Sequence, residues 1–216
     1  MALTGLVMIG FLLMHMYGNL KMFLGPEAFD HYAHWLKGEG DEPGLLYPLL
    51  PQGWFIWIFR AFMVASIVLH IYSAGTLWRR ALAANPTTYE AKRKLAQTYS
   101  ARTMRWGGII LAGFLVFHLL QFTVRSSLVN SQPGATPFDM VVGEFSVWWL
   151  VLAYAIWMVA VCMHVRHGFW SAFATLGANT SAKARVVLNG CAWAIALLLY
   201  IGFMIMPVAV FFGWIQ

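Results

Sequence analysis

The chain has 216 residues, of which 61% are hydrophobic and only 10% are charged. A soluble domain carries roughly 25% charged residues. This composition, with a mean hydropathy of +0.68, excludes a soluble globular protein and predicts an integral membrane protein. The sequence contains no Cys-x-x-Cys pair, no glycine-rich dinucleotide fingerprint and no P-loop. Flavin, nucleotide and all-cysteine iron–sulfur sites are therefore not expected in this chain.

Five stretches are apolar and long enough to cross a membrane, which takes about 20 helical residues. In chain order they cover Ala2–Leu20, Trp54–Trp78, Trp106–Val124, Phe145–Met163 and Val186–Phe212. Because the first stretch has no polar lead-in, we expect the natural chain to begin before it, without a cleaved signal peptide. The fourth helix should continue past His167 to a stop near Gly177, since glycine is a frequent carboxyl-terminal cap. The sequence thus predicts an all-α bundle of five transmembrane helices that forms a single domain.

The segment Asp30–Trp35 lies between the first two spans and has a mixed polar and aromatic composition. We interpret it as an amphipathic segment at the membrane interface. Its two histidines, His31 and His34, are then expected to be exposed to water.

The basic residues are concentrated in two connections. Of the fourteen Lys and Arg residues, seven lie between the second and third spans and three between the fourth and fifth. They are Arg79, Arg80, Lys92, Arg93, Lys94, Arg102, Arg105, Arg166, Lys183 and Arg185. By the positive-inside rule both connections are cytoplasmic, with the amino end inside and the carboxyl end outside. The placement of basic residues on the cytoplasmic side then explains the net charge of +6. This face suits anionic lipid headgroups or an acidic cytoplasmic subunit, and no nucleic-acid partner is expected.

Each of the first four spans contains one histidine: His15, His70, His118 and His164. Ionisable side chains are costly inside a membrane helix and usually mark a functional site. Their distances along the helices from the flanking basic residues give their depths. His15 and His118 fall in the outer half, roughly 20 Å from the cytoplasmic edge, and His70 lies roughly 13 Å from it. His164 reaches a similar inner level, so the histidines form an outer and an inner pair.

Two histidines at one depth on different helices are the ligand pattern of a haem iron inside a helical bundle. Small residues would leave room for a flat macrocycle: Ser66, Ser73 and Ala74 near His70, Gly18 near His15, and Gly113 near His118. Small residues also serve close helix packing, and a single membrane histidine can be a packing residue. The two-layer pattern favours haem ligands.

Haem propionates require cations near the membrane surface. At the inner edge the candidates are Arg79, Arg80, Arg105, Arg166 and His167, and at the outer edge Lys21 or Arg125. Most of these residues also fit a solvated basic surface, so their assignment to propionates depends on the haem interpretation.

Three segments, His15–Lys21, Ala101–Trp106 and His164–Gly177, resemble the five-helix, di-haem cytochrome b subunit of bacterial succinate dehydrogenase and fumarate reductase. The resemblance covers nearly the whole chain. Its most specific motif is the His-x-x-His-Gly-x-x-Ser core of the third segment. The resemblance implies that His70 and His164 ligate one haem b near the soluble subunits, and that His15 and His118 ligate a distal haem b.

The same resemblance implies a membrane subunit of succinate:quinone oxidoreductase in a bacterial plasma membrane. It would anchor a flavoprotein and an iron–sulfur subunit on the cytoplasmic face and exchange electrons with menaquinone or ubiquinone. Succinate would react in the flavoprotein, so this chain should hold no succinate site. The resemblance also suggests that such complexes assemble as trimers. Some family members carry a glutamate two residues before the fourth histidine, where this chain has Cys162. A transmembrane proton path through that position is therefore doubtful.

Three alternatives remain open at this point. Cys162 and Cys191 share the depth of the inner pair and, with His70 and His164, match the ligand set of a Rieske-type [2Fe–2S] centre. Against that centre, residues two apart on a helix, such as Cys162 and His164, point away from one another. A di-haem cytochrome of a hydrogenase or formate dehydrogenase would use the same ligands. A transporter lined by histidines with Asn19, Gln121 and Asn189 is disfavoured because no internal repeat is apparent.

Overall fold

The regular secondary structure of the described residues is entirely helical. The computed structural model of the protein describes residues 1–83, 99–130, 132 and 134–216. Its helices are α1 (Ala2–Leu20), the 3₁₀ turn η1 (Lys21–Leu24), α2 (Pro26–Lys37), α3 (Trp54–Ala83), α4 (Tyr99–Phe122), α5 (Pro137–Phe145), α6 (Trp148–Thr175) and α7 (Ala182–Phe211). Within this described part, five helices are long and apolar enough to cross a membrane: α1, α3, α4, α6 and α7. The predicted all-α, five-span membrane fold is confirmed, and its orientation across the membrane stays a prediction.

The spanning helices extend further than hydropathy alone predicts. α3 continues past Trp78 to Ala83, and α4 begins at Tyr99, well before Trp106. Backbone hydrogen bonds continue into the polar flanks, whereas a hydropathy window ends where charges begin. α6 runs to Thr175 and is followed by Gly177 with a φ of +82°, so the predicted stop near this glycine is confirmed. Of the predicted basic residues, Lys92, Arg93 and Lys94 lie outside the described residues.

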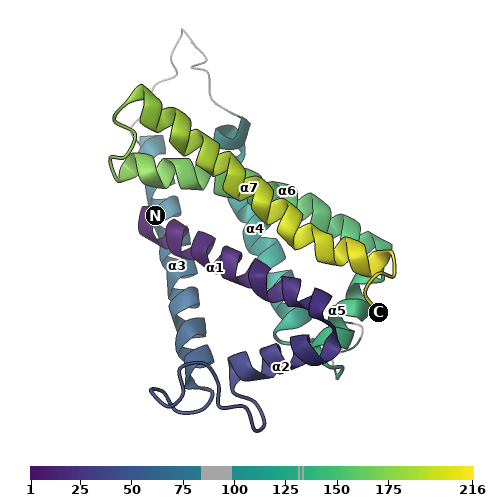
Figure 1. The fold of residues 1–216 in the computed structure, drawn as a ribbon. Coiled ribbons are helices and arrows are strands. Elements are labelled where there is room, and N and C mark those ends of the chain that lie inside the picture. Colours follow the sequence, from purple (N-terminus) through teal and green to yellow (C-terminus); the bar gives the residue numbers. More distant parts are fainter. Residues whose placement is uncertain (84–98, 131, 133) are drawn as a thin grey trace.

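Two shorter helices, α2 and α5, lie together at one end of the bundle (Figure 1). α2 contains the predicted interface segment, and His31 and His34 are exposed there, as expected. The Thr136 hydroxyl caps α5 by accepting the Asp139 N–H at 3.2 Å. The Asp30 carboxylate of α2 accepts the Phe138 N–H at 2.8 Å. This bond satisfies one of the free amide groups at the start of α5 and ties the two helices together.

The turn after α1 folds α2 back onto the end of that helix. The Lys21 ammonium lies over the rings of Tyr17 and Tyr32, 5.3 and 4.9 Å from their centres. Gly18 is packed so closely that an added Cβ would lie 3.2 Å from the Tyr32 hydroxyl. Burial, with a smaller contribution from Tyr17, raises the pKa of Tyr32 above its usual value. Gly18 therefore packs against Tyr32 of α2, and its expected role in making room beside His15 stays a prediction.

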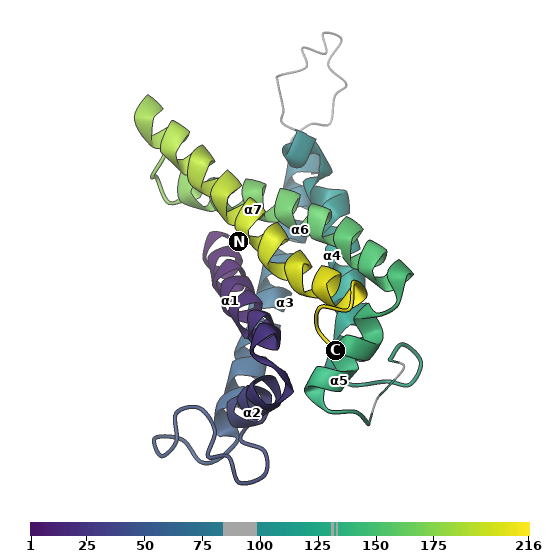
Figure 2. The same ribbon diagram turned by 45° about the vertical axis from the view of Figure 1, so that its right-hand side comes forward.

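The spanning helices differ widely in how much of their surface the protein buries. α6 and α7 pack along one another, α1 crosses both, and α4 packs on α6 (Figures 1 and 2). α3 packs mainly against α1. In the most apolar stretches of α3 and α4 only 6% of residues are buried in the protein, against 39% in α7. α7 is thus the most buried span, and α3 and α4 are the two most open to the surroundings.

Two apolar cores hold the bundle. The first lies between α1, α6 and α7 and includes Ile9, Met158 and Leu199. The second lies under α5 and the carboxyl end of α7 and includes Phe138, Tyr154 and Val210. The second core continues the bundle into the end that α2 and α5 cover, so this end is a packed part of the fold.

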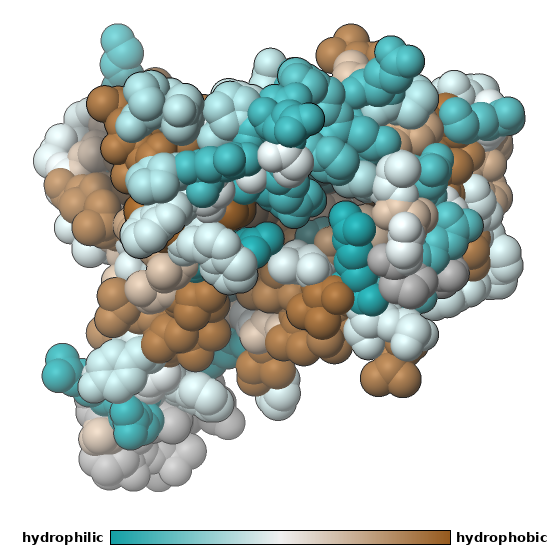
Figure 3. All heavy atoms as spheres, turned by 90° about the horizontal axis from the view of Figure 1, so that it is seen from below, coloured by the Kyte–Doolittle hydropathy of each residue, from teal (hydrophilic) through white to brown (hydrophobic). Residues whose placement is uncertain are grey.

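The ends of the molecule carry opposite kinds of charged residue. Seven of the eight acidic residues belong to the segments around α2 and α5: Glu27, Asp30, Glu39, Asp41, Glu42, Asp139 and Glu144. Seen from this end, hydrophilic side chains spread over much of the upper middle of the surface, and hydrophobic groups gather at the left and across the lower middle (Figure 3). The ends of α3 and α6 and the starts of α4 and α7 lie at the opposite end and carry basic residues that include Arg79, Arg80, Arg105, Lys183 and Arg185.

The crossing of α1 and α7 depends on a glycine. A Cβ placed on Gly202 would collide with the Met16 side chain of α1. We predict that Gly202→Ala lowers the free energy of unfolding by about 1–3 kcal/mol, because extra volume in a packed contact strains both helices. Denaturation in detergent measures this loss. Gly190→Ala is the matched control on α7, since no heavy atom lies within 4 Å of its added Cβ. Equal effects of the two changes would contradict the close crossing.

Candidate functional site

The structure brings His15 of α1 next to His118 of α4. Their ring centres are 5.9 Å apart and their planes are inclined by 79°. Aromatic rings surround the pair: Phe11 stacks on His15 at 5.4 Å, and Phe122 lies 5.4 Å from His118. Phe203 of α7 lies 5.7 Å from His15. Three spanning helices thus form an apolar surround for these two imidazoles.

The other two histidines form a second pair, His70 of α3 with His164 of α6. Their ring centres are 6.4 Å apart, with an interplanar angle of 57°. Two glycines approach these rings. A Cβ on Gly5 of α1 would lie 3.5 Å from His70 Cε1, and one on Gly108 of α4 would lie 3.8 Å from His164 Cε1. The inner pair therefore has four helices around it.

The two pairs lie at different levels of the bundle. Thr4 contacts His70 near the start of α1, whereas His15 lies near its end. From Thr4 to His15, α1 rises about 16 Å. The side chains that the sequence grouped by depth are thus neighbours in the structure, in the same combinations.

The spacing within each pair suits a shared metal ion. Two imidazoles that bind one metal ion from opposite sides, each at about 2 Å, have ring centres roughly 6.4 Å apart. The measured separations are 5.9 and 6.4 Å. His164 Nδ1 is buried without a hydrogen-bond partner among the described residues. Buried polar atoms normally have partners, so a bound group that offers this nitrogen a contact would fit the site. The residues present therefore fit the group that the sequence predicts, and iron binding itself stays a prediction.

One histidine of each pair is oriented by a hydroxyl group. Thr4 Oγ1 donates to the Met1 carbonyl at 3.0 Å and lies 3.2 Å from His70 Nδ1. Tyr154 Oη donates to Gln121 Oε1 at 2.6 Å and lies 3.1 Å from His118 Nδ1. In both cases the hydroxyl group donates its own proton to another acceptor, so its oxygen accepts a hydrogen bond from the Nδ1–H of the histidine. The Nε2 lone pair of each of these histidines is then available as a metal ligand, the arrangement that outer partners impose on ligating histidines.

The polar groups behind His118 were not predicted as part of the site. Gln121, Glu144 and Asn130 are buried, and Gln121 also accepts through its main-chain oxygen from Asn130 Nδ2 at 2.6 Å. Gln121 Nε2 donates to Glu144 Oε2. The sequence offered one signal, a glutamine one helical turn after a membrane histidine. The contact with Glu144 of α5 depends on tertiary packing and has no sequence signature.

The predicted small-residue neighbours are only partly found. Ser66 is buried, but its hydroxyl donates to the Phe62 carbonyl of its own helix. A Cβ on Gly113 would have no heavy atom within 4 Å, so the expectation that this glycine makes room beside His118 finds no contact to support it. Gly5 and Gly108, which do approach histidines, lie on helices other than those carrying the histidines they contact. Helical spacing from a histidine on its own helix could not identify them.

The predicted propionate partners occupy varied surroundings. Arg79 is exposed, and Arg105 lies over the Trp78 ring, 5.5 Å from its centre. Arg166 donates to Asn189 Oδ1 at 2.7 Å and lies over Trp193, which joins α6 to α7. His167 is half-buried one turn from His164. Their roles at a haem stay predictions.

The two cysteines are not gathered with the inner histidines. Cys162 Sγ donates to the Ala196 carbonyl of α7 at 3.0 Å, and Cys191 is exposed on α7. Over the described ranges, no group of three or more His, Cys, Asp or Glu side chains is placed to hold a metal ion. A Rieske-type centre needs four such ligands, so this arrangement gives that alternative no support.

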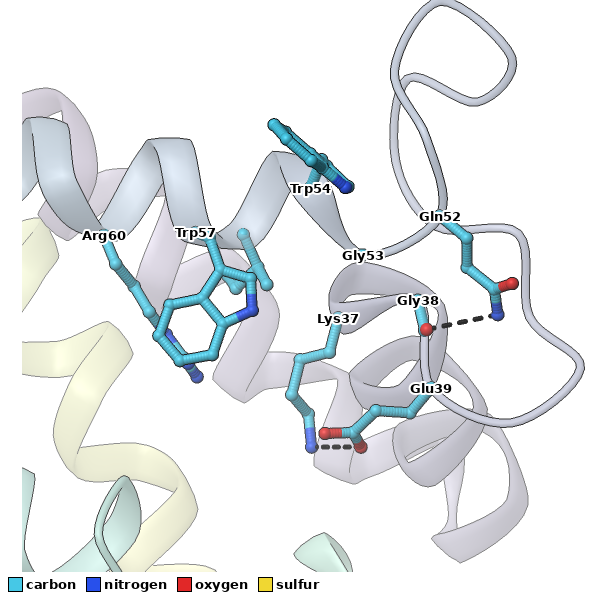
Figure 4. A pocket seen from close by; sticks show the side chains of 9 residues that line it. Lys37, Gly38, Glu39, Gln52, Gly53, Trp54, Trp57 and Arg60 are labelled. Atoms are coloured by element: carbon cyan, nitrogen blue, oxygen red, sulfur yellow. Dashed lines mark hydrogen bonds and ion pairs between the residues drawn. The ribbon is translucent and has the colours of Figure 1, made fainter.

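An open pocket of about 340 Å³ lies away from both histidine pairs, between the end of α2 and the start of α3. Figure 4 shows Trp57 and Arg60 of α3 pointing to the side on which Lys37 and Glu39 lie, whereas the Trp54 ring points the other way. The Lys37 ammonium and the Glu39 carboxylate form an ion pair at 2.7 Å, and Arg60 lies over Trp57. Tryptophan and basic side chains with partly apolar contacts are typical of a membrane interface.

Comparisons with known proteins give no further assignment: no protein-family model, curated protein or solved structure matches the chain.

The hydroxyl behind His70 provides a test of the inner pair's geometry. Thr4→Val keeps the side-chain shape but removes the acceptor for His70 Nδ1. We predict a loss of about 1 kcal/mol of unfolding free energy, because a partly buried donor is left unsatisfied. Thr76→Val is the control, since the Thr76 hydroxyl donates to the Tyr72 carbonyl of its own helix. Denaturation of both variants in detergent measures the difference, and a loss no larger than the control's would argue against the Thr4–His70 bond.

Proposed function

We propose that this protein is the membrane-embedded electron-transfer subunit of a succinate:quinone oxidoreductase. The observation that carries the proposal is the presence of two histidine pairs, each joining two spanning helices and each spaced for one metal ion. The resemblance of the His164–Gly177 segment to the family's cytochrome b subunit supports the assignment of that metal as haem iron. The proposed cofactors are two haem b groups, which supply one-electron exchange when bound.

In this proposal each pair has a defined task. His70 and His164 hold the inner haem, and His15 and His118 hold the outer one. Thr4 and Tyr154 keep one Nδ1 of each pair protonated, so that Nε2 faces the metal as an unprotonated donor. Phe11, Phe122 and Phe203 pack around the outer pair and exclude water from it. The chain itself thus binds, orients and insulates the two centres.

The basic end is proposed to be cytoplasmic and to receive the soluble subunits. Arg79, Arg80, Arg105, Lys183 and Arg185 are exposed there. The positive-inside rule favours this orientation, and the concentration of acidic residues at the opposite end agrees with it. A flavoprotein and an iron–sulfur subunit would bind this surface, and the inner pair would be the one nearer to them. Succinate would be oxidised in the flavoprotein.

The electron partner within the membrane is proposed to be a quinone, menaquinone or ubiquinone. A lipid-soluble carrier is required because the outer pair lies inside the bilayer, where a soluble redox protein has no access. The proposed location is a bacterial plasma membrane. Co-purification with a subunit carrying covalent flavin supports this proposal, whereas co-purification with a nickel or molybdenum subunit would assign the chain to a different oxidoreductase.

Substitution of single histidines tests the cofactor assignment. We predict that His118→Ala and His70→Ala each lose one of two haem b groups, because each removes a ligand from a different pair. Haem is measured by pyridine extraction and by reduced-minus-oxidised spectra of the purified complex. His34→Ala, at an exposed position on α2, serves as the control and should keep both haems. Retention of both haems in either ligand variant would contradict the proposal.

Replacing both thiols separates haem from iron–sulfur chemistry. The double variant Cys162→Ala, Cys191→Ala should keep the full haem content and show no loss of non-haem iron from this subunit. The physical reason is that the Cys162 thiol donates a hydrogen bond to the Ala196 carbonyl of α7 and that Cys191 is exposed. Loss of an iron–sulfur electron paramagnetic resonance signal on thiol removal would instead support the [2Fe–2S] alternative.

A further inference from the structure

A continuous series of buried polar side chains leads away from His118 towards α5. Its members are Tyr154 of α6, Gln121 of α4 and Glu144 of α5, with exposed fractions of 7%, 0% and 1%. Buried polar groups in an apolar bundle are costly unless they are hydrogen-bonded to one another. Three helices, α4, α5 and α6, supply this series, so it cannot be explained as local helix capping.

The hydrogen bonds of the series have a defined direction. A carboxylate accepts hydrogen bonds and donates none, so the Gln121 amide must present its NH₂ group to Glu144. Gln121 Oε1 then faces the other way and accepts the Tyr154 hydroxyl proton at 2.6 Å. With its proton committed, the Tyr154 oxygen accepts from His118 Nδ1, 3.1 Å away. Each bond thus fixes the direction of the next.

Neighbouring contacts hold the distal end of this series in place. Asn130 Nδ2 donates to the main-chain oxygen of Gln121 at 2.6 Å. α5, which carries Glu144, is fixed at its start by Thr136 and by Asp30 of α2. Glu144 is 1% exposed and precedes Phe145, a member of the second apolar core. The carboxylate is therefore held at one position relative to the outer histidine pair.

We propose that Glu144 is a positioning residue for the outer metal site: acting through Gln121 and Tyr154, it sets His118 in the tautomer with a proton on Nδ1 and an unprotonated Nε2. The metal-ligand role of His118 rests on the proposed function, whereas the tautomer does not. The negative charge of Glu144 also stabilises the oxidised, more positive state of a metal held by His118. At His70, Thr4 fixes the tautomer but supplies no negative charge, because the Thr4 hydroxyl donates to a main-chain carbonyl. We therefore expect the protein to influence the reduction potentials of the two metal sites differently.

The experiment uses the full chain in lipid nanodiscs, with ring-¹⁵N-labelled histidine. The His118 signals are assigned from their absence in His118→Ala. In Tyr154→Phe the Nδ1 signal should move because its acceptor is gone. Glu144→Leu should move the same signal in the same direction, although residue 144 does not touch His118, because Gln121 is then free to reverse. Asp139→Asn, an equal charge change at an exposed position on the same helix, should leave the signal unchanged.

A second measurement separates charge from hydrogen bonding. Glu144→Gln keeps the size of the side chain and an oxygen acceptor but removes the charge. In the haem-loaded complex we expect a higher reduction potential for the outer haem and no shift for the inner one. The ¹⁵N shift of His118 should be smaller than in Glu144→Leu. If Glu144→Leu does not fold, Glu144→Gln provides both readouts.

The outcomes distinguish this proposal from the proposed function. Unchanged His118 signals and an unchanged outer potential in a folded Glu144→Gln variant would overturn the role of Glu144. If the complex contains no haem, the proposed function fails, and the ¹⁵N signals of the haem-free chain still decide the tautomer. Equal shifts of all histidine signals would indicate general loosening of the bundle and would also overturn the proposal.

Discussion

Pairing between histidines of different helices is the constraint on which the arrangement of this bundle depends. An imidazole in an apolar bundle loses its water contacts and requires a partner. The protein gives His118 and His70 hydroxyl partners, and it places His15 beside His118 and His70 beside His164. The two pairs bring α1 to α4 and α3 to α6. α3 buries little surface against other helices, and its histidine provides one of its few contacts across the bundle. A metal ion shared within each pair would give these links their strength.

α1 relates the two levels to one another. It carries His15 of the outer pair, and near its start it carries Thr4 and Gly5, both in contact with His70. Its position is fixed by the close crossing at Gly202 of α7 and by the turn that folds α2 back. A shift of α1 along its axis would disturb both pairs at once. The geometry of both histidine pairs therefore depends on how α1 packs.

The sequence predicted the fold class, the five spans and the combinations of histidines, because each follows from properties read along a single helix. Hydropathy identifies a span, and the helical rise converts position into depth. Contacts between helices were predicted poorly. Gly18 packs on Tyr32, whereas Gly5 and Gly108 approach the inner histidines from other helices. The bond from Gln121 to Glu144 depends on how α5 folds back on α4. A single sequence contains no pattern that reports such a distance.

The number of haem groups bound per chain tests the central claim most directly. A redox titration of the purified complex, combined with pyridine extraction of the same sample, gives both the amount of haem b and the number of reduction steps. The account predicts two haems b per chain, reduced in two steps that are assigned to different histidine pairs. A complex that retains its soluble partners and quinone reactivity but contains no haem b would contradict it.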